Sequence, residues 1–567
     1  MTPFFEAPPQ LQNQFSGDSA LQSCLRRLLP PDVLAEITSG LESLGDIVAS
    51  KMPPLAAAAE AQPPVHVPYD AWGQRVDEIR IAGAWDELKR IAATEGIVAT
   101  AYERKHAAYS RIHQMTRLYL FHPSSAIYSC PLAMTDGAAR VLELMGGDTL
   151  KQRALQRLVS RDPDQFWTSG QWMTERTGGS DVGKTLTQAK PGECDGEWLL
   201  HGSKWFTSAV TSEMALTLAR TDERVPGTRG LSLFYLETRN ENGALNGIQI
   251  RRLKDKLGTR ALPTAELELR GARAIMLGGP GNGVRKIAPL LNITRSYNAI
   301  CALGYMRRGI ALARDYATRR EAFGRLLCQQ PLHLETLADM QTELEGGIQL
   351  TMRMVELLGK DECGEATETE QALLRILTPL AKLSTGKQAV AVCSEVLECF
   401  GGAGYVEDTG LPGLLRDAQV LPIWEGTTNI LSLDVLRAAD CEGALKPLMD
   451  DCQRLLTDCA ANVQRPDLEM SCQKAAGALR QLVSYGRQLS ELHPDNVQAG
   501  ARVFALGLAR TYSAALLIQH AVWSAEHEGD AAAARIAAAR RWCRKSLVRL
   551  CSSDESDLSE TAALAMT

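Results

Sequence analysis

The sequence has few histidines and no closely paired cysteines, and both scarcities exclude particular kinds of site. Only 9 of the 567 residues are histidine, and the 14 cysteines include no Cys-x-x-Cys pair. Structural zinc sites and disulfide frameworks need closely spaced ligands or paired thiols. We therefore predict no metal site. The scattered cysteines favour a reducing, cytoplasmic location in which thiols stay free.

The chain also lacks an excess of positive charge and lacks a long apolar run. Its formal net charge is −6 and its pI is near 6.0, so no overall basic field attracts nucleic acid or an anionic membrane. No segment approaches the roughly 18 uninterrupted apolar residues that a membrane span needs. The first fifteen residues have neither the basic start of a signal peptide nor the arginines of a transit peptide. These features predict a soluble protein.

Hydrophobic periodicity separates helical regions from one strand-rich region. Between residues 166 and 275, Ala265, Leu267 and Leu269 alternate with charged residues, as expected of half-buried strands. Elsewhere apolar residues recur at intervals of three and four, which is typical of amphipathic helices. The longest such stripe comprises Leu334, Leu337, Met340, Leu344, Ile348, Met352 and Val355. The fold class we predict is α+β, with a β-domain between helical domains and a helix bundle after it.

We predict five regions along the chain. They are a helical extension with a linker (1–68), a helical domain (69–165), the β-domain (166–275), a helix-bundle domain (276–440) and a C-terminal helical extension (441–567). The linker is placed at residues 52–64, where prolines bracket an alanine run. The polar and small residues from about Ser552 onward are expected to be disordered.

A single carboxylate interrupts an otherwise apolar and neutral segment, LPIWEGTTNI. Glu425 lies there between Trp424 and Gly426. Poor solvation raises the pKa of a carboxyl group, which would let Glu425 remove a weakly acidic carbon-bound proton near neutral pH. A surface turn is the alternative for an isolated tripeptide, so the interpretation depends on other motifs.

Two motifs some 250 residues upstream have the chemistry of a ligand site. In MTERTGGSD (173–181), paired glycines allow close approach of the backbone, and Thr174 and Ser180 offer hydroxyls. In GSKWFTS (202–208), Trp205 and Thr207 would share one face of a strand and could meet a planar cofactor. A buried core tryptophan is the alternative.

Two further motifs suit a phosphate-bearing ligand. A guanidinium beside an aromatic ring, as at Arg320 and Phe323, fits a pyrophosphate and its nucleoside. The turn at Gly401 and Gly402 follows a helical pattern and would present backbone N–H groups to phosphate oxygens. Each motif alone is compatible with ordinary packing.

Together and in this order, the five motifs resemble the acyl-CoA dehydrogenase family of flavoproteins, over roughly residues 70–440. The segments 69–77, 252–258, 424–426 and 431–437 resemble its AidB-like, adaptive-response branch in particular. The resemblance implies bound FAD and α,β-desaturation of an acyl-CoA thioester. In that reaction Glu425 would take a proton from the α-carbon while a hydride passes to flavin N5.

The resemblance also assigns roles to the other motif residues. Thr174 and Thr207 would hydrogen-bond the flavin ring, Trp205 would lie along it, and Ser180 would contact both cofactor and substrate. Asn292 and Arg295 would contact the substrate, where medium-chain members of the family have phenylalanine and aspartate near CoA. The remaining expected FAD contacts are Met173, Gly179, Phe206, Arg320, Phe323, Gly401, Gly402, Trp424, Gly426, Thr427 and Asn429.

Four of those contacts, Arg320, Phe323, Gly401 and Gly402, would come from a neighbouring subunit. The resemblance therefore implies a homo-oligomer, most often a tetramer, and an electron acceptor such as electron-transfer flavoprotein.

Two alternative functions remain open at this point. One is an AidB-like flavoprotein with a nucleic-acid-binding or stress-response role, favoured by a basic segment that we expect to be helical over 535–549. Acidic residues follow this segment, so a solvated helix face is the simpler interpretation. The other is a fatty-acyl-binding flavoprotein with little turnover.

Overall fold

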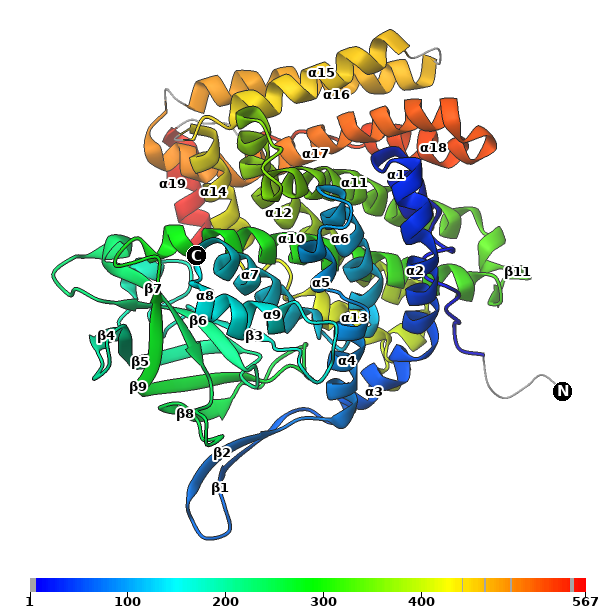
Figure 1. Ribbon diagram of the computed structural model, residues 1–567. Coiled ribbons are helices and arrows are strands. Elements are labelled where there is room, and N and C mark those ends of the chain that lie inside the picture. The colour runs from blue at the N-terminus through cyan, green and yellow to red at the C-terminus, as the bar shows by residue number, and fades with distance from the viewer. Residues whose placement is uncertain (1–6, 441, 463–465, 490–491, 551–554) are drawn as a thin grey trace. The chain divides into compact units, whose positions relative to one another are not determined.

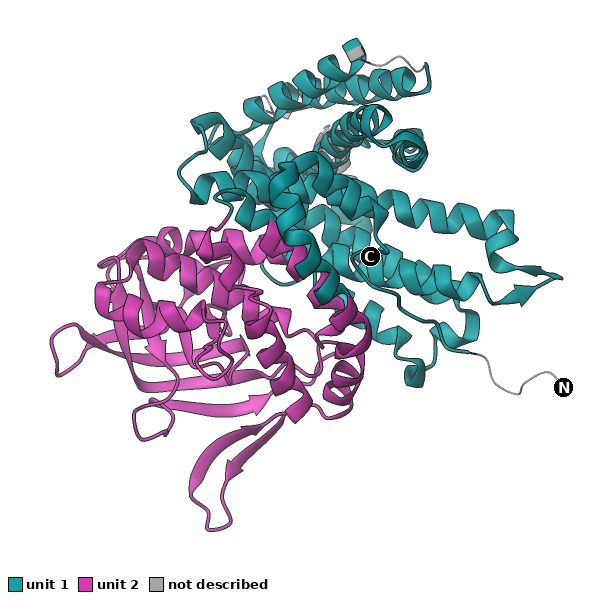
Figure 2. Ribbon diagram, turned by 45° about the vertical axis from the view of Figure 1, so that its right-hand side comes forward, with its two compact units in different colours: residues 1–45, 106–112, 298–567 teal, residues 46–105, 113–297 magenta. Residues whose placement is uncertain are grey.

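The computed structural model describes residues 7–440, 442–462, 466–489, 492–550 and 555–567. The chain divides into two compact units, which are considered separately (Figure 2). The sheet unit comprises residues 46–105 and 113–297, and the bundle unit comprises residues 1–45, 106–112 and 298–567. Of the segment that we expected to be disordered, residues 552–554 lie outside the described residues.

The sheet unit is built on one sheet of seven strands (Figure 1). The strands are β3 (Ser169–Trp172), β4 (Gln188–Pro191), β5 (Glu197–Ser208), β6 (Met214–Arg220), β7 (Leu231–Glu237), β8 (Ile248–Leu253) and β9 (Thr264–Leu277). Their order is β3-β6-β4-β5-β9-β7, with β8 beside β9. An additional pairing of β6 with β7 joins the two sides of the sheet, so β4, β5, β9, β7 and β6 form a closed ring.

The two faces of this sheet bury separate apolar clusters. Ala265, Leu267 and Leu269 of β9 are buried with Trp172 and Phe234 in one cluster, as the alternation predicted. The other cluster packs helix residues against β6 and β7. Its helices are α7 (Ser129–Met145), the short α8 (Asp148–Leu150) and α9 (Gln156–Leu158), and the start of α10 (Gly283–Ala317). The α+β fold class is confirmed.

The remaining elements of the sheet unit include a hairpin and a helix that we did not predict. Strands β1 (Val65–Tyr69) and β2 (Arg75–Arg80) form the hairpin, which the buried Asp77 anchors by accepting hydrogen bonds from Arg75 and from the backbone of Ile250. Residues 52–61 form helix α3 (Met52–Ala61) instead of a linker. Its prolines stand at the first turn, where a missing N–H costs nothing, and alanine favours helix.

Three more helices connect these parts. They are α4 (Gly83–Thr94), α5 (Ala99–Glu103) and α6 (Tyr109–Phe121). Trp85 of α4 is buried and donates its indole N–H to the carbonyl oxygen of Ala126. This region is helical, as the periodicity predicted.

The bundle unit is helical throughout, apart from the small hairpin of β10 (Glu321–Ala322) and β11 (Arg325–Leu326). Its first helices are α1 (Ser19–Leu28), α2 (Pro31–Ser50), the end of α10, α11 (Pro331–Glu362), α12 (Glu368–Cys399), α13 (Leu411–Ala418) and α14 (Thr428–Asp440). The predicted apolar stripe lies on α11 and is buried from Leu337 to Val355, whereas Leu334 is 47% exposed.

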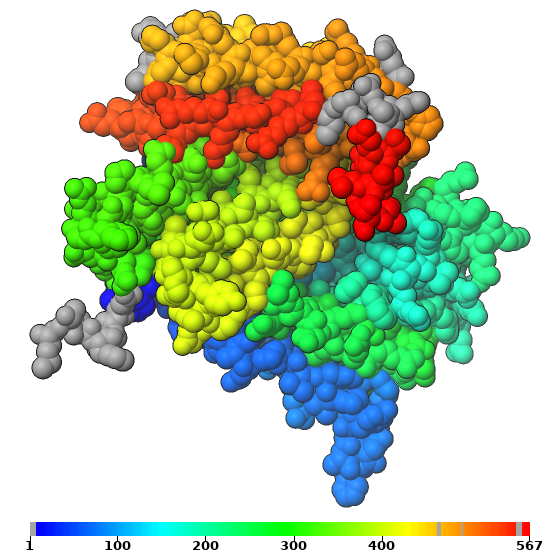
Figure 3. Space-filling model, turned by 180° about the vertical axis from the view of Figure 1, so that it is seen from behind, coloured from blue at the N-terminus to red at the C-terminus, as the bar shows by residue number. Residues whose placement is uncertain are grey.

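The C-terminal helices pack around one central helix. They are α15 (Leu445–Asn462), α16 (Pro466–Leu489), α17 (Pro494–His527), α18 (Ala532–Arg544) and α19 (Glu555–Ala565). The helix α17 contacts α11, α14, α15, α16 and α18. In the space-filling view, the orange and orange-red helices of this region form bands above the yellow segment (Figure 3). By length and composition α17 could cross a membrane, but 78% of its most apolar stretch is buried, as in a core helix.

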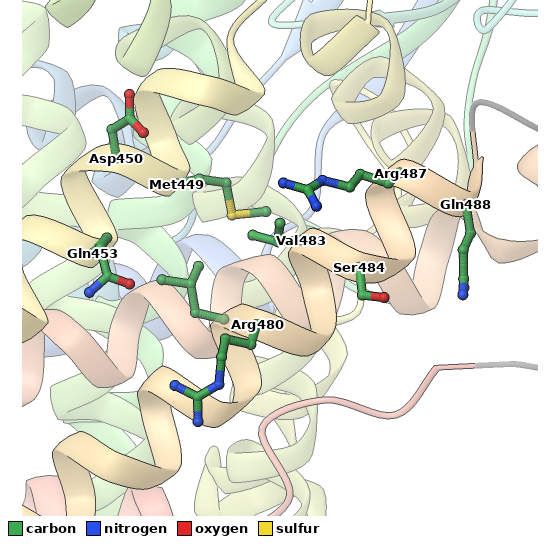
Figure 4. A pocket seen from close by; sticks show the side chains of 9 residues that line it. Met449, Asp450, Gln453, Arg480, Val483, Ser484, Arg487 and Gln488 are labelled. Atoms are coloured by element: carbon green, nitrogen blue, oxygen red, sulfur yellow. The ribbon is translucent and has the colours of Figure 1, made fainter.

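Two expectations for the C-terminal region are wrong. The segment from Glu555 forms α19 instead of being disordered. The basic segment that we expected to be helical over 535–549 is helical only as far as Arg544, and Lys545 after it is extended. A cavity of about 540 Å³ lies between α15 and α16, with Arg487 pointing over Met449 and Val483 (Figure 4). None of the residues that line it belongs to the predicted site.

A buried polar network ties α1 to α17. The Nε of Arg27 donates to Nδ1 of His520, so Nε2 carries the imidazole proton and faces the Ser23 hydroxyl at 3.0 Å. That hydroxyl donates in turn to Glu528. Burial, with Arg27 nearby, lowers the pKa of His520 to about 3. The imidazole is therefore neutral in the folded protein.

We predict that His520 makes the bundle unit sensitive to acid. Its pKa rises from about 3 to roughly 6.5 on unfolding, so stability is complete above pH 6.5 and falls as the pH is lowered toward 3. The contribution reaches about 1.4 kcal/mol per pH unit. Urea unfolding at several pH values should show a smaller loss at low pH for His520→Gln than for the wild type. The exposed His201→Gln is the control, and identical pH dependence in all three proteins would refute the prediction.

Candidate active site

The structure brings the two predicted cofactor motifs of the sheet unit together. Thr174 lies two residues after the end of β3, and Trp205 lies near the end of β5. The backbone N–H of Trp205 donates to the carbonyl oxygen of Thr174 at 2.9 Å. Strand β5 runs from Glu197 through the whole second motif to Ser208.

A buried ion pair holds these motifs in place. The Lys204 ammonium donates to Glu175 at 2.9 Å and to the carbonyl oxygen of Leu218 on β6, also at 2.9 Å. Glu175 accepts further hydrogen bonds from the hydroxyl and N–H of Thr187 and from the N–H of Leu186. Burial raises the pKa of Glu175, but Lys204 and these donors outweigh it and hold the pKa below its ordinary value. We did not predict this pair, although Glu175 lies inside the first motif and Lys204 inside the second.

A β-bulge sets the directions of the side chains in the second motif. The register of β5 against β9 shifts between Lys204 and Thr207, so two residues of β5, Trp205 and Phe206, face a single residue of β9. Simple alternation, on which we based the shared face of Trp205 and Thr207, does not apply across it. Lys204 and Thr207 are both 1% exposed, whereas Phe206 is 58% exposed.

Thr207 has the property expected of a cofactor contact. Its buried Oγ1 has no hydrogen-bond partner among the described residues. An unpaired buried hydroxyl costs about 1–3 kcal/mol, so native proteins seldom leave one without a ligand or water. A polar ring edge such as that of a flavin would satisfy it.

The glycines of the first motif allow a tight turn beside Thr174. Gly178 has a φ of +117° and donates its N–H to the carbonyl oxygen of Glu175. A Cβ at Gly179 would lie 2.7 Å from the Thr174 hydroxyl, so only glycine leaves that hydroxyl undisturbed. Met173 packs against the apolar cluster below, and Ser180 is exposed.

The segment around Glu425 is fixed by helices of the bundle unit. The buried Lys382 of α12 donates to the carbonyl oxygen of Gly426 at 2.5 Å. The side-chain amide of Asn298 on α10 is oriented so that its oxygen accepts from the Trp424 indole N–H and its nitrogen donates to the carbonyl oxygen of Leu421. Glu425 itself is half-buried and has a φ of +57°, a strained value for a residue with a side chain.

The other predicted residues of the bundle unit lie in exposed positions. Phe323 is fully exposed at the tip of the β10–β11 hairpin, where it and Gly324 have φ of +52° and +74°, as in a type I′ turn. Gly401 and Gly402 follow α12 with open space around both α-carbons, and Arg320 is also exposed. Thr427 and Asn429 stand exposed at the start of α14, where Asn429 accepts a hydrogen bond from Arg502 of α17.

The two predicted substrate residues lie one turn apart on α10 in the sheet unit. Asn292 and Arg295 are half-buried there. The backbone carbonyl oxygen of Asn292 accepts a hydrogen bond from the Ser296 hydroxyl.

Known protein families match successive parts of the chain. The models that match are the AidB N-terminal domain (residues 7–165), the acyl-CoA dehydrogenase middle domain (170–272), the acyl-CoA dehydrogenase C-terminal domain (281–439) and the acyl-CoA dehydrogenase 11 C-terminal domain-like family (444–566). The last of these covers the C-terminal extension.

Individual relatives resemble the chain over most of its length. Acyl-CoA dehydrogenase family member 11 of Caenorhabditis elegans is 46% identical, with 91% of this chain and 86% of the relative covered. AidB of Escherichia coli (strain K12) is 33% identical, with 70% and 73% covered. The crystal structure of Caenorhabditis elegans ACDH-11 in complex with C11-CoA superimposes with a TM-score of 0.94 at 44% identity, covering 99% of this chain and 97% of that one.

We predict that breaking the Lys204–Glu175 pair destabilises the sheet unit. Lys204→Met leaves the Glu175 carboxylate buried without its cation, which costs roughly 3–5 kcal/mol. The double variant Lys204→Met/Glu175→Gln should regain part of that loss because no charge remains buried. Urea unfolding measures both effects. The exposed pair of Lys184 and Asp181 gives the control, Lys184→Met, and an equally small loss for Lys204→Met would contradict the prediction.

Proposed function

The chain belongs to the acyl-CoA dehydrogenase family, whose cofactor is FAD, and we propose that it catalyses the α,β-desaturation of an acyl-CoA thioester. The observation that carries this proposal is the preserved set of motif residues, in which Glu425 stands in a segment fixed by Lys382 and Asn298. The N-terminal and C-terminal matches identify the AidB-like branch.

Glu425 is the base in the proposed reaction. Its carboxylate takes the proton from the α-carbon as that C–H bond breaks, and the carbonyl oxygen of the thioester gains negative charge. The backbone N–H of Glu425 is the chain's own donor to that oxygen. Hydrogen bonds aimed at developing charge lower the barrier because they are already oriented before the reaction. FAD, when bound, accepts the hydride from the β-carbon.

The sheet-unit motifs hold the flavin ring in this proposal. The unpaired Oγ1 of Thr207 supplies one hydrogen bond, and Thr174 supplies another from the segment that its backbone joins to Trp205. The indole of Trp205 lies along the ring. Met173, Gly179, Ser180 and Phe206 line the same segments.

The substrate is a medium to long acyl-CoA. Support comes from the ACDH-11 structure, which matches this chain over almost its full length and was solved with C11-CoA. Ser180, Asn292 and Arg295 are the chain's expected substrate contacts. Asn292 and Arg295 stand one helical turn apart, so both can reach the same part of a ligand.

A homotetramer completes the FAD site in this proposal. Support comes from Phe323, a large apolar side chain that is wholly exposed at the tip of a hairpin and is therefore accessible to another chain. Arg320, Phe323, Gly401 and Gly402 would then meet a neighbouring subunit's cofactor, while Trp424, Gly426, Thr427 and Asn429 would meet the chain's own. The electrons pass to an acceptor such as electron-transfer flavoprotein. No disulfide bond joins the cysteines among the described residues, which agrees with a cytoplasmic location.

The basic C-terminal segment does not favour the nucleic-acid alternative. Arg535 is buried against Glu345, and Arg541 pairs with Glu335 and Asp339 of α11. These guanidinium groups bind α18 to α11. Cations that already have carboxylate partners offer little to phosphate.

We predict that Glu425→Gln abolishes dehydrogenation without releasing FAD. Loss of a general base costs roughly a hundred- to ten-thousand-fold in rate, and the amide keeps the size of the side chain. Steady-state turnover of a panel of acyl-CoA thioesters measures the effect, and the flavin content of the purified protein checks the cofactor. The exposed Asp408→Asn is the control. Unchanged turnover in Glu425→Gln would rule out the mechanism, and would leave fatty-acyl binding with little turnover if the wild type is equally slow.

We predict that Phe323→Ser weakens assembly and FAD binding together. The side chain is fully exposed, so its loss should leave the unfolding of the single chain unchanged. Light scattering should show a smaller mass at equal concentration, and less FAD should copurify. Leu186→Ser, which removes another exposed apolar side chain, should change neither quantity. A Phe323→Ser protein with wild-type mass and flavin content would contradict the proposed assembly.

A further inference from the structure

An ammonium group lies against the indole that is expected to meet the flavin. The Nζ of Lys254 is 3.6 Å from the centre of the Trp205 ring and 4.8 Å from that of Phe206. A cation within about 6 Å of an aromatic face is attracted by the electron-rich π system, and most strongly by tryptophan. Lys254 follows β8 and lies outside both cofactor motifs.

The ammonium is held in this place by a carboxylate. Glu266 of β9 accepts a hydrogen bond from Lys254 at 2.6 Å and a second from Arg252 at 2.8 Å. The side chains of Lys254 and Glu266 are only 11% and 12% exposed. The backbone N–H of Lys254 also donates to the carbonyl oxygen of Thr264. A lysine fixed at both ends keeps little of its usual freedom.

This arrangement fixes the indole before any ligand arrives. The bulge at residues 204–207 leaves Trp205 outside the regular alternation of β5, so strand geometry alone does not determine where its ring points. Lys254 covers one side of the ring, and the backbone of Trp205 is bonded to Thr174. Trp205 is half-buried, so part of its ring is accessible to a planar ligand.

We propose that Lys254 is a positioning residue for the flavin and acts through Trp205. The inference rests on the proposed contact between Trp205 and the cofactor. Lys254 orders the indole in advance, so that binding of the ring system does not have to supply that ordering. It also places a fixed positive charge against the indole. That charge stabilises negative charge on a ring system that stacks on the indole. Glu266 is the residue that holds Lys254.

A double-variant cycle on FAD binding tests this proposal. Apoprotein is titrated with FAD for the wild type, Lys254→Met, Trp205→Leu and the combination of both. We expect Lys254→Met to weaken FAD binding about tenfold, in line with a partly buried cation–π contact. In the Trp205→Leu background, the same substitution should have almost no further effect, because Lys254 has no ring to act on.

Conservative and neighbouring variants separate positioning from general stability. Lys254→Arg keeps a cation that can stack on the ring and should restore FAD affinity to within about threefold of the wild type. Glu266→Gln should weaken FAD binding in the same direction as Lys254→Met. Glu268→Gln is the matched control, since Glu268 on the same strand pairs with Arg270 and has no aromatic contact. The near-ultraviolet circular dichroism of the apoproteins reports whether the indole has lost its fixed orientation.

The outcomes decide between the inference and the proposed function. Wild-type FAD affinity in Lys254→Met, or an equal loss with and without Trp205, would overturn the role of Lys254. If Lys254→Met does not fold, Glu266→Gln and Lys254→Arg carry the same comparison. If the wild type turns over acyl-CoA but the cycle shows no coupling between Lys254 and Trp205, the inference fails and the proposed function stands. If Lys254 and Trp205 are coupled in FAD binding but the wild type never turns over acyl-CoA, the proposed function fails and the inference stands.

Discussion

The buried pair of Lys204 and Glu175 is the constraint on which the sheet-unit half of the site depends. Separating the two charges would leave one of them buried without a partner. The strand that contains Lys204 and the turn that contains Glu175 therefore stay joined. The bond from Lys204 to Leu218 ties both to β6. Thr174 and Trp205 are the sequence neighbours of Glu175 and Lys204, and Thr207 lies three residues after Lys204, so the pair restrains all three. The contact of Lys254 with Trp205 adds a further restraint on the ring itself.

The bundle unit fixes its part of the site by a related means. A buried lysine is again the attachment, since the Lys382 ammonium of α12 donates to the carbonyl oxygen of Gly426. Asn298 holds the preceding Trp424 from another helix. The strained backbone of Glu425 persists between these two attachments, because the surrounding contacts determine its conformation. Rigid helices thus position a base that lies in a loop.

The sequence predicted the fold class and the AidB-like family because both depend on local patterns. Alternation along β9 and the apolar stripe of α11 depend on residues two to four positions apart, which a single sequence displays directly. The partners of Lys204, Lys254 and Lys382 lie 12 to 44 residues away along the chain, so no local pattern identifies them. The bulge in β5 escaped prediction for the same reason, since it depends on register against β9. Helix α3 was mistaken for a linker because its prolines were interpreted as breaks, whereas they begin a helix.

The central claim is that this chain uses bound FAD to oxidise an acyl-CoA, and the flavin's own colour reports that directly. Holoprotein is mixed without oxygen or any electron acceptor with saturated acyl-CoA thioesters of increasing chain length, and the visible absorption of oxidised flavin is followed. The account predicts that at least one medium or long thioester bleaches the flavin as the enoyl product forms. A fully loaded flavoprotein that keeps its colour with every thioester would contradict it.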